Sequence, residues 1–272
     1  MWRKGAFAGE FLDPLVSNST LTGTSVDGSI ASLLGALRDG SGLCGAAAAN
    51  APPSTAPPSS LLDGATSAAL IELRALLGDA ARTSATLSTI ADDEAFALAL
   101  AQILATLNGL AVGERAIVPG GWNGKGGKVP VIHVVENLGG QRFGFTTINA
   151  QVPDKKAEYH AISANFYPKI KIRAAIRFEC DAAALLDEGF WFMLLQNNRT
   201  SDANAHGGAV LYESLLPHLA GKQLHVALAD AGDAVQGEWE TPQRSQRCFY
   251  RVVLSTCRYL LRELGLDAVQ RK

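Results

Sequence analysis

The chain lacks the sequence features that define several protein classes. Its four cysteines are scattered at Cys44, Cys180, Cys248 and Cys257 with no C-x-x-C pair, which predicts free thiols in a reducing compartment and no disulfide framework. The formal net charge is only −2, so charge alone does not favour nucleic-acid binding. No apolar run reaches the roughly 18 residues that span a bilayer. The first residues, MWRKGAFAGEF, lack the continuous apolar stretch of a signal peptide. These absences predict a cytoplasmic protein that binds neither nucleic acid nor membrane.

Metal and nucleotide motifs are also missing. The histidines show neither H-x-x-x-H nor H-x-x-H spacing and none stands beside a cysteine at ligand spacing, so we expect no metal site. The glycine-rich run GGWNGKGG (120–127) is not a phosphate-binding loop, because Lys128 is followed by Val129 and a predicted strand where Ser or Thr and a helix are required. The sequence therefore predicts no cofactor.

The composition is that of a folded protein with a distinct N-terminal part. Hydrophobic residues make up 47% of the chain and charged residues 18%, which excludes a wholly disordered chain. Residues 1–60 are predicted to form a helical, low-complexity region with one short helix at 29–38 and the proline-rich linker APPSTAPPSS at 51–60. A helical segment follows at 61–112, with helices predicted over 67–77 and 93–108. In the second helix, helical spacing places the following residues on one stripe: Phe96, Leu100, Ile103, Leu104 and Leu107.

Residues 113–272 have the pattern of an α+β domain. Strands are predicted at 115–121, 129–136, 141–150 and 167–179, and NLGG (137–140) is a hairpin turn between the second and third. Helices are predicted at 181–195, 208–220 and 246–264. Strands followed by helices, without regular alternation, favour an antiparallel or mixed sheet packed by helices over a doubly wound fold.

The strand at 167–179 has one basic face. Its apolar residues alternate with Lys169, Lys171, Arg173 and Arg177. A solvated face is the ordinary explanation of such a pattern, and the alternative is a surface that docks an acidic partner.

The glycine-rich run at 120–127 is expected to be a loop with Trp122 at its tip. Gly126 and Gly127 would let that loop pass close to another surface, and Trp122 would contact a substrate. A plain connection between two strands is the alternative.

The stretch TPQRSQRCFYRVVLSTCRYLL (241–261) has the most informative pattern. If Ser245 is the N-cap, Cys248 lies in the first helical turn, where free backbone N–H groups and the helix dipole favour a thiolate. Gln243 could direct its amide at an oxyanion above that thiol. The alternative for Cys248 is an ordinary half-buried thiol. Cys257 lies on the apolar stripe of the same helix and is expected in the core.

In this stretch a glutamine stands a few residues before a cysteine that opens a buried helix, and both follow a strand hairpin. This arrangement resembles that of the thiol peptidases of the SUMO-specific and adenovirus protease clan. Residues 113–265 also look like a segment of very large eukaryotic proteins linked to ubiquitin hydrolysis, with TPQRSQRC as the most specific piece. The resemblance implies that Cys248 is the nucleophile, Gln243 the oxyanion donor and Asn149 the residue that orients the base.

The base is where the chain departs from that clan. A histidine is expected just after the glycines, where the chain has Lys128 and Val129. His133 is four residues further along the same face, which is about 13 Å at roughly 3.3 Å per residue. That distance exceeds the hydrogen-bond reach that a base requires. A register shift or a different histidine, His160, would be needed, and a plain sheet histidine is the alternative for His133.

Two hypotheses follow. The first is a deubiquitinase-type thiol hydrolase that cleaves an isopeptide or peptide bond after a ubiquitin or ubiquitin-like tail. The second is a pseudoenzyme with the same fold, which binds a partner protein without catalysis. The oligomeric state, and whether the chain is part of a larger protein, are left open by the sequence.

Overall fold

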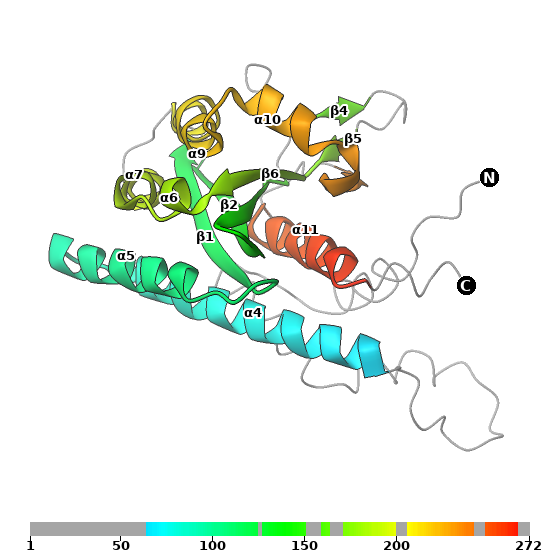
Figure 1. Cartoon of the computed structure of the whole chain (residues 1–272). Coiled ribbons are helices and arrows are strands. Elements are labelled where there is room, and N and C mark those ends of the chain that lie inside the picture. The colour runs from blue at the N-terminus through cyan, green and yellow to red at the C-terminus, as the bar shows by residue number, and fades with distance from the viewer. Residues whose placement is uncertain are drawn as a thin grey trace, which may run out of the picture.

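The computed structural model describes residues 64–124, 127–150, 159–163, 171–199, 206–241 and 248–265. Within these ranges the protein has the α+β fold that the sequence predicts, with a four-stranded and a three-stranded antiparallel sheet (Figure 1). The linker at 51–60 and the short helix expected at 29–38 lie outside the described residues.

Two helices precede the sheet. Helix α4 spans Gly64–Ser88, which is longer at both ends than the 67–77 predicted, and α5 spans Asp93–Asn108 as predicted. Asp92 is the N-cap of α5, since its side chain accepts a hydrogen bond from the Ala95 N–H at 2.8 Å. The predicted stripe of α5 is the face that packs on the sheet, although Leu104 is only partly buried.

The main sheet has the strand order β1-β2-β3-β6, and all neighbours are antiparallel. Strand β1 (Arg115–Gly124) and β2 (Gly127–Gly139) form a hairpin, and β2 forms a second hairpin with β3 (Arg142–Ile148). The hairpin predicted at NLGG is present, but its two turn residues are Gly140 and Gln141, with φ angles of 59° and 64°, and residues 137–139 belong to β2. The loop expected over the whole of 120–127 is wrong, since residues up to Gly124 and from Gly127 are paired strand residues.

The single strand predicted at 167–179 is divided between two sheets. Strand β5 (Lys171–Arg173) pairs with β4 (Ile162–Ser163) and β7 (Trp239–Glu240), whereas β6 (Ala175–Asp181) pairs with β3. The break falls at buried Ala174. The fully solvated basic face is also wrong, because the Arg177 side chain is only 12% exposed and pairs with Glu136 and Glu263.

The remaining helices follow the sheet in the chain. They are α6 (Ala182–Leu185), α7 (Glu188–Arg199), α8 (Gly207–Ala209), the π-helix η1 (Val210–Leu215), α9 (Leu216–Ala220), α10 (Leu224–Ala231), the 3₁₀ turn η2 (Asp233–Val235) and α11 (Cys248–Glu263). The predicted helices at 181–195 and 208–220 therefore appear as several shorter elements, and α10 was not predicted.

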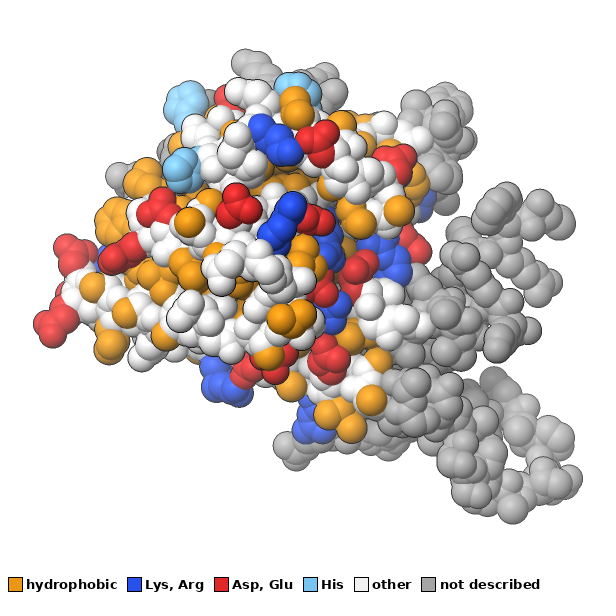
Figure 2. Space-filling view, viewed as in Figure 1, with side chains coloured by type: hydrophobic (Ala, Val, Ile, Leu, Met, Phe, Trp, Pro, Cys, Tyr) orange, Lys and Arg blue, Asp and Glu red, His pale blue; other side chains and the backbone are white. Residues whose placement is uncertain are grey.

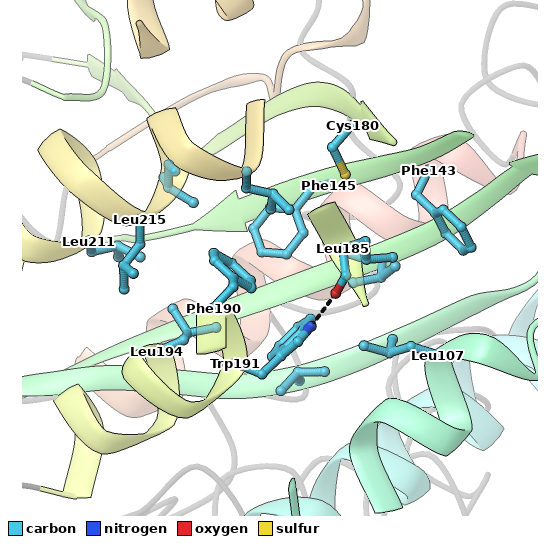
Figure 3. Packing of buried hydrophobic residues seen from close by; sticks show 14 of the residues in the cluster. Leu107, Phe143, Phe145, Cys180, Leu185, Phe190, Trp191, Leu194, Leu211 and Leu215 are labelled. Carbon is cyan, nitrogen blue, oxygen red and sulfur yellow. Dashed lines mark hydrogen bonds between the residues drawn. The ribbon is translucent and has the colours of Figure 1, made fainter. Parts of the chain in front are cut away.

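The main sheet has a buried core on each face. Figure 3 shows the larger core, where Phe145 meets Phe190 and Trp191 from α7, and the Trp191 indole N–H donates to the Leu185 carbonyl at 2.6 Å. Helices α5, α6, α7 and α9 pack on this face, which we call the α7 face. Helices α4 and α11 contribute the second core with Ile132 and Ile148, on what we call the α11 face.

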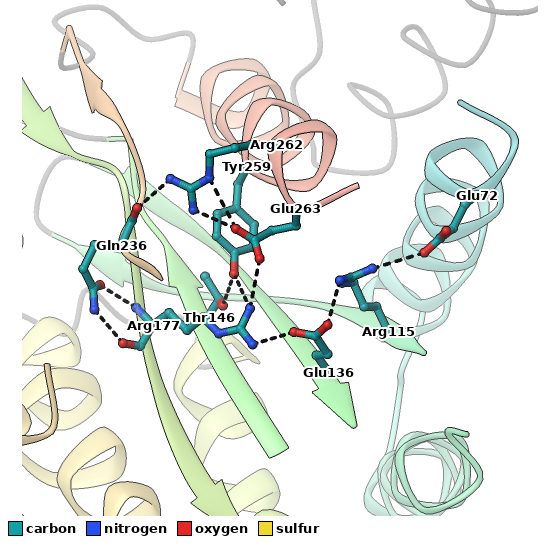
Figure 4. A network of polar contacts seen from close by, with 9 residues as sticks. All are labelled: Glu72, Arg115, Glu136, Thr146, Arg177, Gln236, Tyr259, Arg262 and Glu263. Atoms are coloured by element: carbon teal, nitrogen blue, oxygen red, sulfur yellow. Dashed lines mark hydrogen bonds and ion pairs between the residues drawn. The ribbon is translucent and has the colours of Figure 1, made fainter. Parts of the chain in front are cut away.

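A polar network crosses the α11 face (Figure 4). Glu136 on β2 receives one arginine on each side, Arg115 at 2.6 Å and Arg177 at 2.5 Å. Arg177 also contacts Tyr259 and Glu263 of α11. Because one network spans β1, β2, β6 and α11, it fixes how α11 lies across the sheet.

Candidate functional site

A groove runs along β1, which is the edge strand of the main sheet among the described residues. Its volume is about 960 Å³, its walls are α4 and α5, and its floor is the β1 side from Gly113 to Val118. Apolar side chains such as Leu76 and Ile103 line it together with threonines, including Thr83 and Thr106. The two walls diverge because α4 belongs to the core of the α11 face and α5 to the core of the α7 face.

A second pocket of about 300 Å³ extends this groove along β1. Leu87 lines both hollows, and the floor passes from Val118 in the first to Pro119 and Gly120 in the second. The far end is lined by residues 128–130 at the start of β2 and by Phe249 in the first turn of α11. We call the two hollows together the β1 groove. It connects the helical segment to the glycine-rich hairpin and to the helix that begins with Cys248.

The backbone of β1 has bonding groups on its open side. The Gly113 N–H donates to the Asn137 carbonyl at 2.7 Å, and the Asn137 N–H donates to the Glu114 carbonyl at 3.0 Å. In an antiparallel pair every second residue is bonded to the partner strand, so from this point Ala116 and Val118 are bonded to β2. The N–H and carbonyl groups of Arg115 and Ile117 therefore face the groove.

Pro119 occupies the next position that faces away from β2. Proline has no N–H, and in natural sheets it is confined largely to edge strands and strand ends. The row of donors on the open side of β1 therefore ends at Pro119.

Charges of both signs line the α4–α5 part of the β1 groove. Glu72 and Arg115 form an ion pair at 3.4 Å, Asp79 pairs with Arg82, and the Glu114 carboxylate accepts the Ala111 N–H. Figure 2 shows the same mixture over one face of the whole molecule, where acidic and basic side chains are interspersed.

The hairpin end of the β1 groove differs in charge. Its lining includes Lys128 and Arg199 and no acidic residue. Lys128 is exposed, and Arg199 pairs with Asp93 at 3.2 Å across the surface. Even with the fully exposed Asp93 counted, two positive side chains stand against one negative one, and this net positive charge favours anions at the hairpin end.

Trp122 is partly buried against the core on strand β1 and is not at the tip of a loop. It lies on β1 opposite Val129, and its ring meets the Tyr212 ring edge-on at 6.3 Å. A Cβ atom at Gly207 would lie 2.6 Å from Trp122, so only glycine allows α8 to approach the indole. Gly127 begins β2, and Gly126 lies outside the described residues.

Asn149 belongs to a cluster around Tyr212, a residue of the π-helix that sequence reasoning did not single out. The Asn149 side-chain amide donates to the Tyr212 hydroxyl at 3.2 Å, and His160 Nε2 lies 2.8 Å from the same oxygen. His160 Nδ1 is 2.7 Å from the Arg173 carbonyl, which fixes the Nδ1–H tautomer. Tyr159 stacks on Tyr212 at 4.4 Å. Both ring nitrogens of His160 are thus engaged within this cluster.

His133 lies on the α7 face of the main sheet. Its ring packs 5.3 Å from the Phe145 ring, its Nδ1 is 3.2 Å from the Thr147 hydroxyl, and its Nε2 has no hydrogen-bond partner. The side chain is completely buried, and burial lowers its pKa to about 3. Its strand neighbours Ile132 and Val134 point to the α11 face instead.

Cys248 begins α11, and α11 packs on the face of the sheet opposite His133. The side chain of Cys248, together with Gln243 and Ser245, lies outside the described residues. Cys257 is in the core as predicted: it is fully buried, and burial raises its thiol pKa to about 12. The described residues thus bring Asn149, Trp122 and His160 together around Tyr212, and they place His133 and α11 on opposite faces.

Within the described ranges, no group of three or more histidine, cysteine or acidic side chains could hold a metal ion. No described helix is both long enough and apolar enough to cross a membrane. Comparison with known proteins returns no matching family, no matching curated sequence and no matching solved structure.

The β1 groove itself could not be located from the sequence. The stripe of α5 was visible, but the groove forms between α4 and α5 only because each helix packs on a different face of β1. Pro119 within the strand-like run RAIVPGG was the one signal of an edge strand.

Proposed function

We propose that this chain is a protein-binding domain that receives an extended segment of a partner polypeptide. The observation that supports it is the β1 groove, in which backbone groups of an edge strand that face away from β2 lie between two helices whose walls mix apolar and polar side chains. Peptide recognition at an exposed sheet edge uses backbone bonds for affinity and side-chain pockets for specificity.

The binding role is favoured over a His133-dependent thiol hydrolase. A general base must lie within hydrogen-bond reach of its thiol, directly or through one water. The main sheet stands between His133 and α11, and β2 directs the imidazole away from that helix. A partner of the ubiquitin system, including a ubiquitin-like tail, remains within this proposal as one candidate polypeptide.

A display selection tests the binding role. A random library of extended peptides is selected on the folded protein, and the enriched peptides are then measured on two variants of α5. Thr106→Trp fills the groove, whereas Ala101→Trp adds the same ring at an exposed position of α5 that does not line it.

We expect enriched peptides that lose binding to Thr106→Trp and keep it on Ala101→Trp. Failure to enrich any peptide, or equal binding to both variants, would overturn the proposal. Matching circular-dichroism melts establish that both variants are folded.

A second candidate function is the thiol hydrolase acting through Cys248 with a base other than His133. The observation in its favour is that Phe249, next to Cys248, lines the same hollow as residues 128–130 of the glycine-rich hairpin. A tail that ran parallel to β1 would therefore have its C-terminus beside the first turn of α11.

A ubiquitin or SUMO probe with a thiol-reactive C-terminus tests this candidate. Cys180 and Cys257 serve as internal controls, since both are buried and burial raises each thiol pKa to about 12. Labelling of a Cys44→Ser protein that disappears in Cys44→Ser/Cys248→Ala would support hydrolase chemistry. No labelling of the folded protein would exclude it for these probes.

A further inference from the structure

Building on the proposed function, we infer that the β1 groove binds its partner as an added β-strand that runs antiparallel to β1, with an acidic side chain at the N-terminal end of the bound segment. The occupant is a segment of a partner protein.

The pairing of the added strand with β1 follows from which residues of β1 already bond to β2. Arg115 and Ile117 present their N–H and carbonyl groups to the groove, whereas Ala116 and Val118 use theirs on β2. An added strand can therefore bond to β1 at every second residue. The eight floor residues from Gly113 to Gly120 correspond to roughly 26 Å of strand at about 3.3 Å per residue.

The shape of the groove selects a single extended chain. Helices α4 and α5 flank the open side of β1, so the edge of another complete sheet would meet one of the two helices. A lone strand would place alternate side chains against each wall. Small and β-branched side chains suit such half-buried positions on both faces.

The direction rests on the sheet and on the charges. All pairs in the main sheet are antiparallel, and antiparallel pairing is slightly the more stable per residue. Because β1 runs from Arg115 toward the hairpin, an antiparallel segment begins beside Gly120 and ends beside Gly113. Its N-terminal end then lies at the hairpin end of the groove, where Lys128 and Arg199 would attract an acidic side chain.

Synthetic peptides of about seven residues with alternating valine and threonine test these points against the full chain. One capped peptide has glutamate at its first position, one has lysine there, and one has glutamate at its last position. Binding is measured by fluorescence anisotropy. The first peptide should bind most tightly, and Lys128→Glu should reverse the preference between glutamate and lysine. Lys222→Glu, at an exposed lysine of the turn after α9, is the matched control and should leave the preference unchanged.

Backbone methylation gives a readout that only strand addition produces. Two further peptides are N-methylated at either the even or the odd positions. Since only alternate N–H groups of an added strand point at β1, one set should lose at least about tenfold in affinity, because each methyl group removes a hydrogen bond to β1, and the other set should lose less than about twofold.

Equal losses for both methylated sets would overturn strand addition, and tighter binding of the peptide with terminal glutamate at its last position would overturn the direction. Display-selected peptides could bind the groove and yet show neither the alternating effect of N-methylation nor the preference for an N-terminal glutamate. That result would overturn strand addition with this direction and charge, and the proposed peptide-binding function would still stand. Overlapping peptides from residues 1–63 that displace the probe would assign the groove to the chain itself and overturn a partner. If the protein formed a dimer that the peptide probe dissociates, the groove would be assigned to a second copy of this chain, and this too would overturn a partner protein.

Discussion

His133 shows how one buried side chain constrains its surroundings. A Cβ atom at Gly120 would lie 2.9 Å from His133 Nε2 and 3.1 Å from the adjacent ring carbon. The ring sits in the core and cannot turn away, so glycine is required on β1 for steric reasons, not for backbone freedom. The Nε2 atom has no partner in that position. Replacing the imidazole by an apolar side chain should therefore be tolerated.

Gly120→Ala is expected to lower the free energy of unfolding by about 1–3 kcal/mol, because the added methyl overpacks the core against His133. The same substitution in a His133→Val background should cost clearly less, since the ring is gone. Urea unfolding of the four proteins of this cycle measures the coupling. Equal costs in both backgrounds would show that the imidazole does not enforce glycine at this position.

The two buried histidines make acid unfolding predictable. Burial lowers the pKa of His133 to about 3 and that of His160 to about 4, from an ordinary 6.5. Below about pH 6.5 the unfolded chain therefore takes up protons that the folded protein does not, and stability falls as the pH falls toward 4. Above pH 6.5 neither imidazole changes stability, because it is neutral in both states.

For each histidine, the free energy of unfolding should fall by at most about 1.4 kcal/mol for each unit by which the pH is lowered. His133→Met should reduce the loss of stability between about pH 7 and about pH 5, whereas exposed His225→Gln should not. Urea unfolding at the two pH values measures both variants. An unchanged pH dependence in His133→Met would contradict a neutral imidazole at this site.

At the scale of elements, the position of α11 depends on the Glu136 network as well as on its apolar stripe. The side chains of Glu136, Arg115 and Arg177 are each only 12% exposed. Removing one member of a buried charged group leaves part of the remaining charge uncompensated, which costs more than the group contributes when complete. The network therefore makes α11 sensitive to a change on β2.

Glu136→Ala should lower the free energy of unfolding by about 3 kcal/mol, since two largely buried arginines lose their shortest ion pair. Glu179→Ala is the matched control, because it removes an ion pair with Arg142 whose side chains are about half exposed, and it should cost less than about 1 kcal/mol. Chemical denaturation gives both values. If both substitutions lowered the free energy of unfolding by similarly small amounts, solvent would be screening the Glu136 network.

At the scale of the whole molecule, the helical segment and the sheet share their cores. Leu107 of α5 is fully buried in the core of the α7 face, and Leu73 and Leu77 of α4 are buried in that of the α11 face. The groove between the helices exists only while both are docked. Folding of residues 64–112 is thus coupled to folding of the sheet.

Leu107→Ala should lower stability by about 2–5 kcal/mol, because it leaves a cavity where α5 meets the sheet. Hydrogen exchange should show amides of α4, α5 and β3 losing protection together. Leu98→Ala, at a mostly exposed position of α5, should change little. Selective loss of protection in α4 and α5 would instead show that they form a separate unit.

The local pattern of the sequence determined the elements whose stability is local. The stripe and cap of α5 and the glycines at 139 and 140 predict that helix and that turn, because capping, periodicity and positive φ angles depend on neighbouring residues. The division of 167–179 at Ala174, the burial of Arg177 and the opposite faces of His133 and α11 depend on contacts between segments far apart in the chain. Alternation can place residues on one face of a strand, but only the packed structure decides which helix covers that face, and so which side chains can meet.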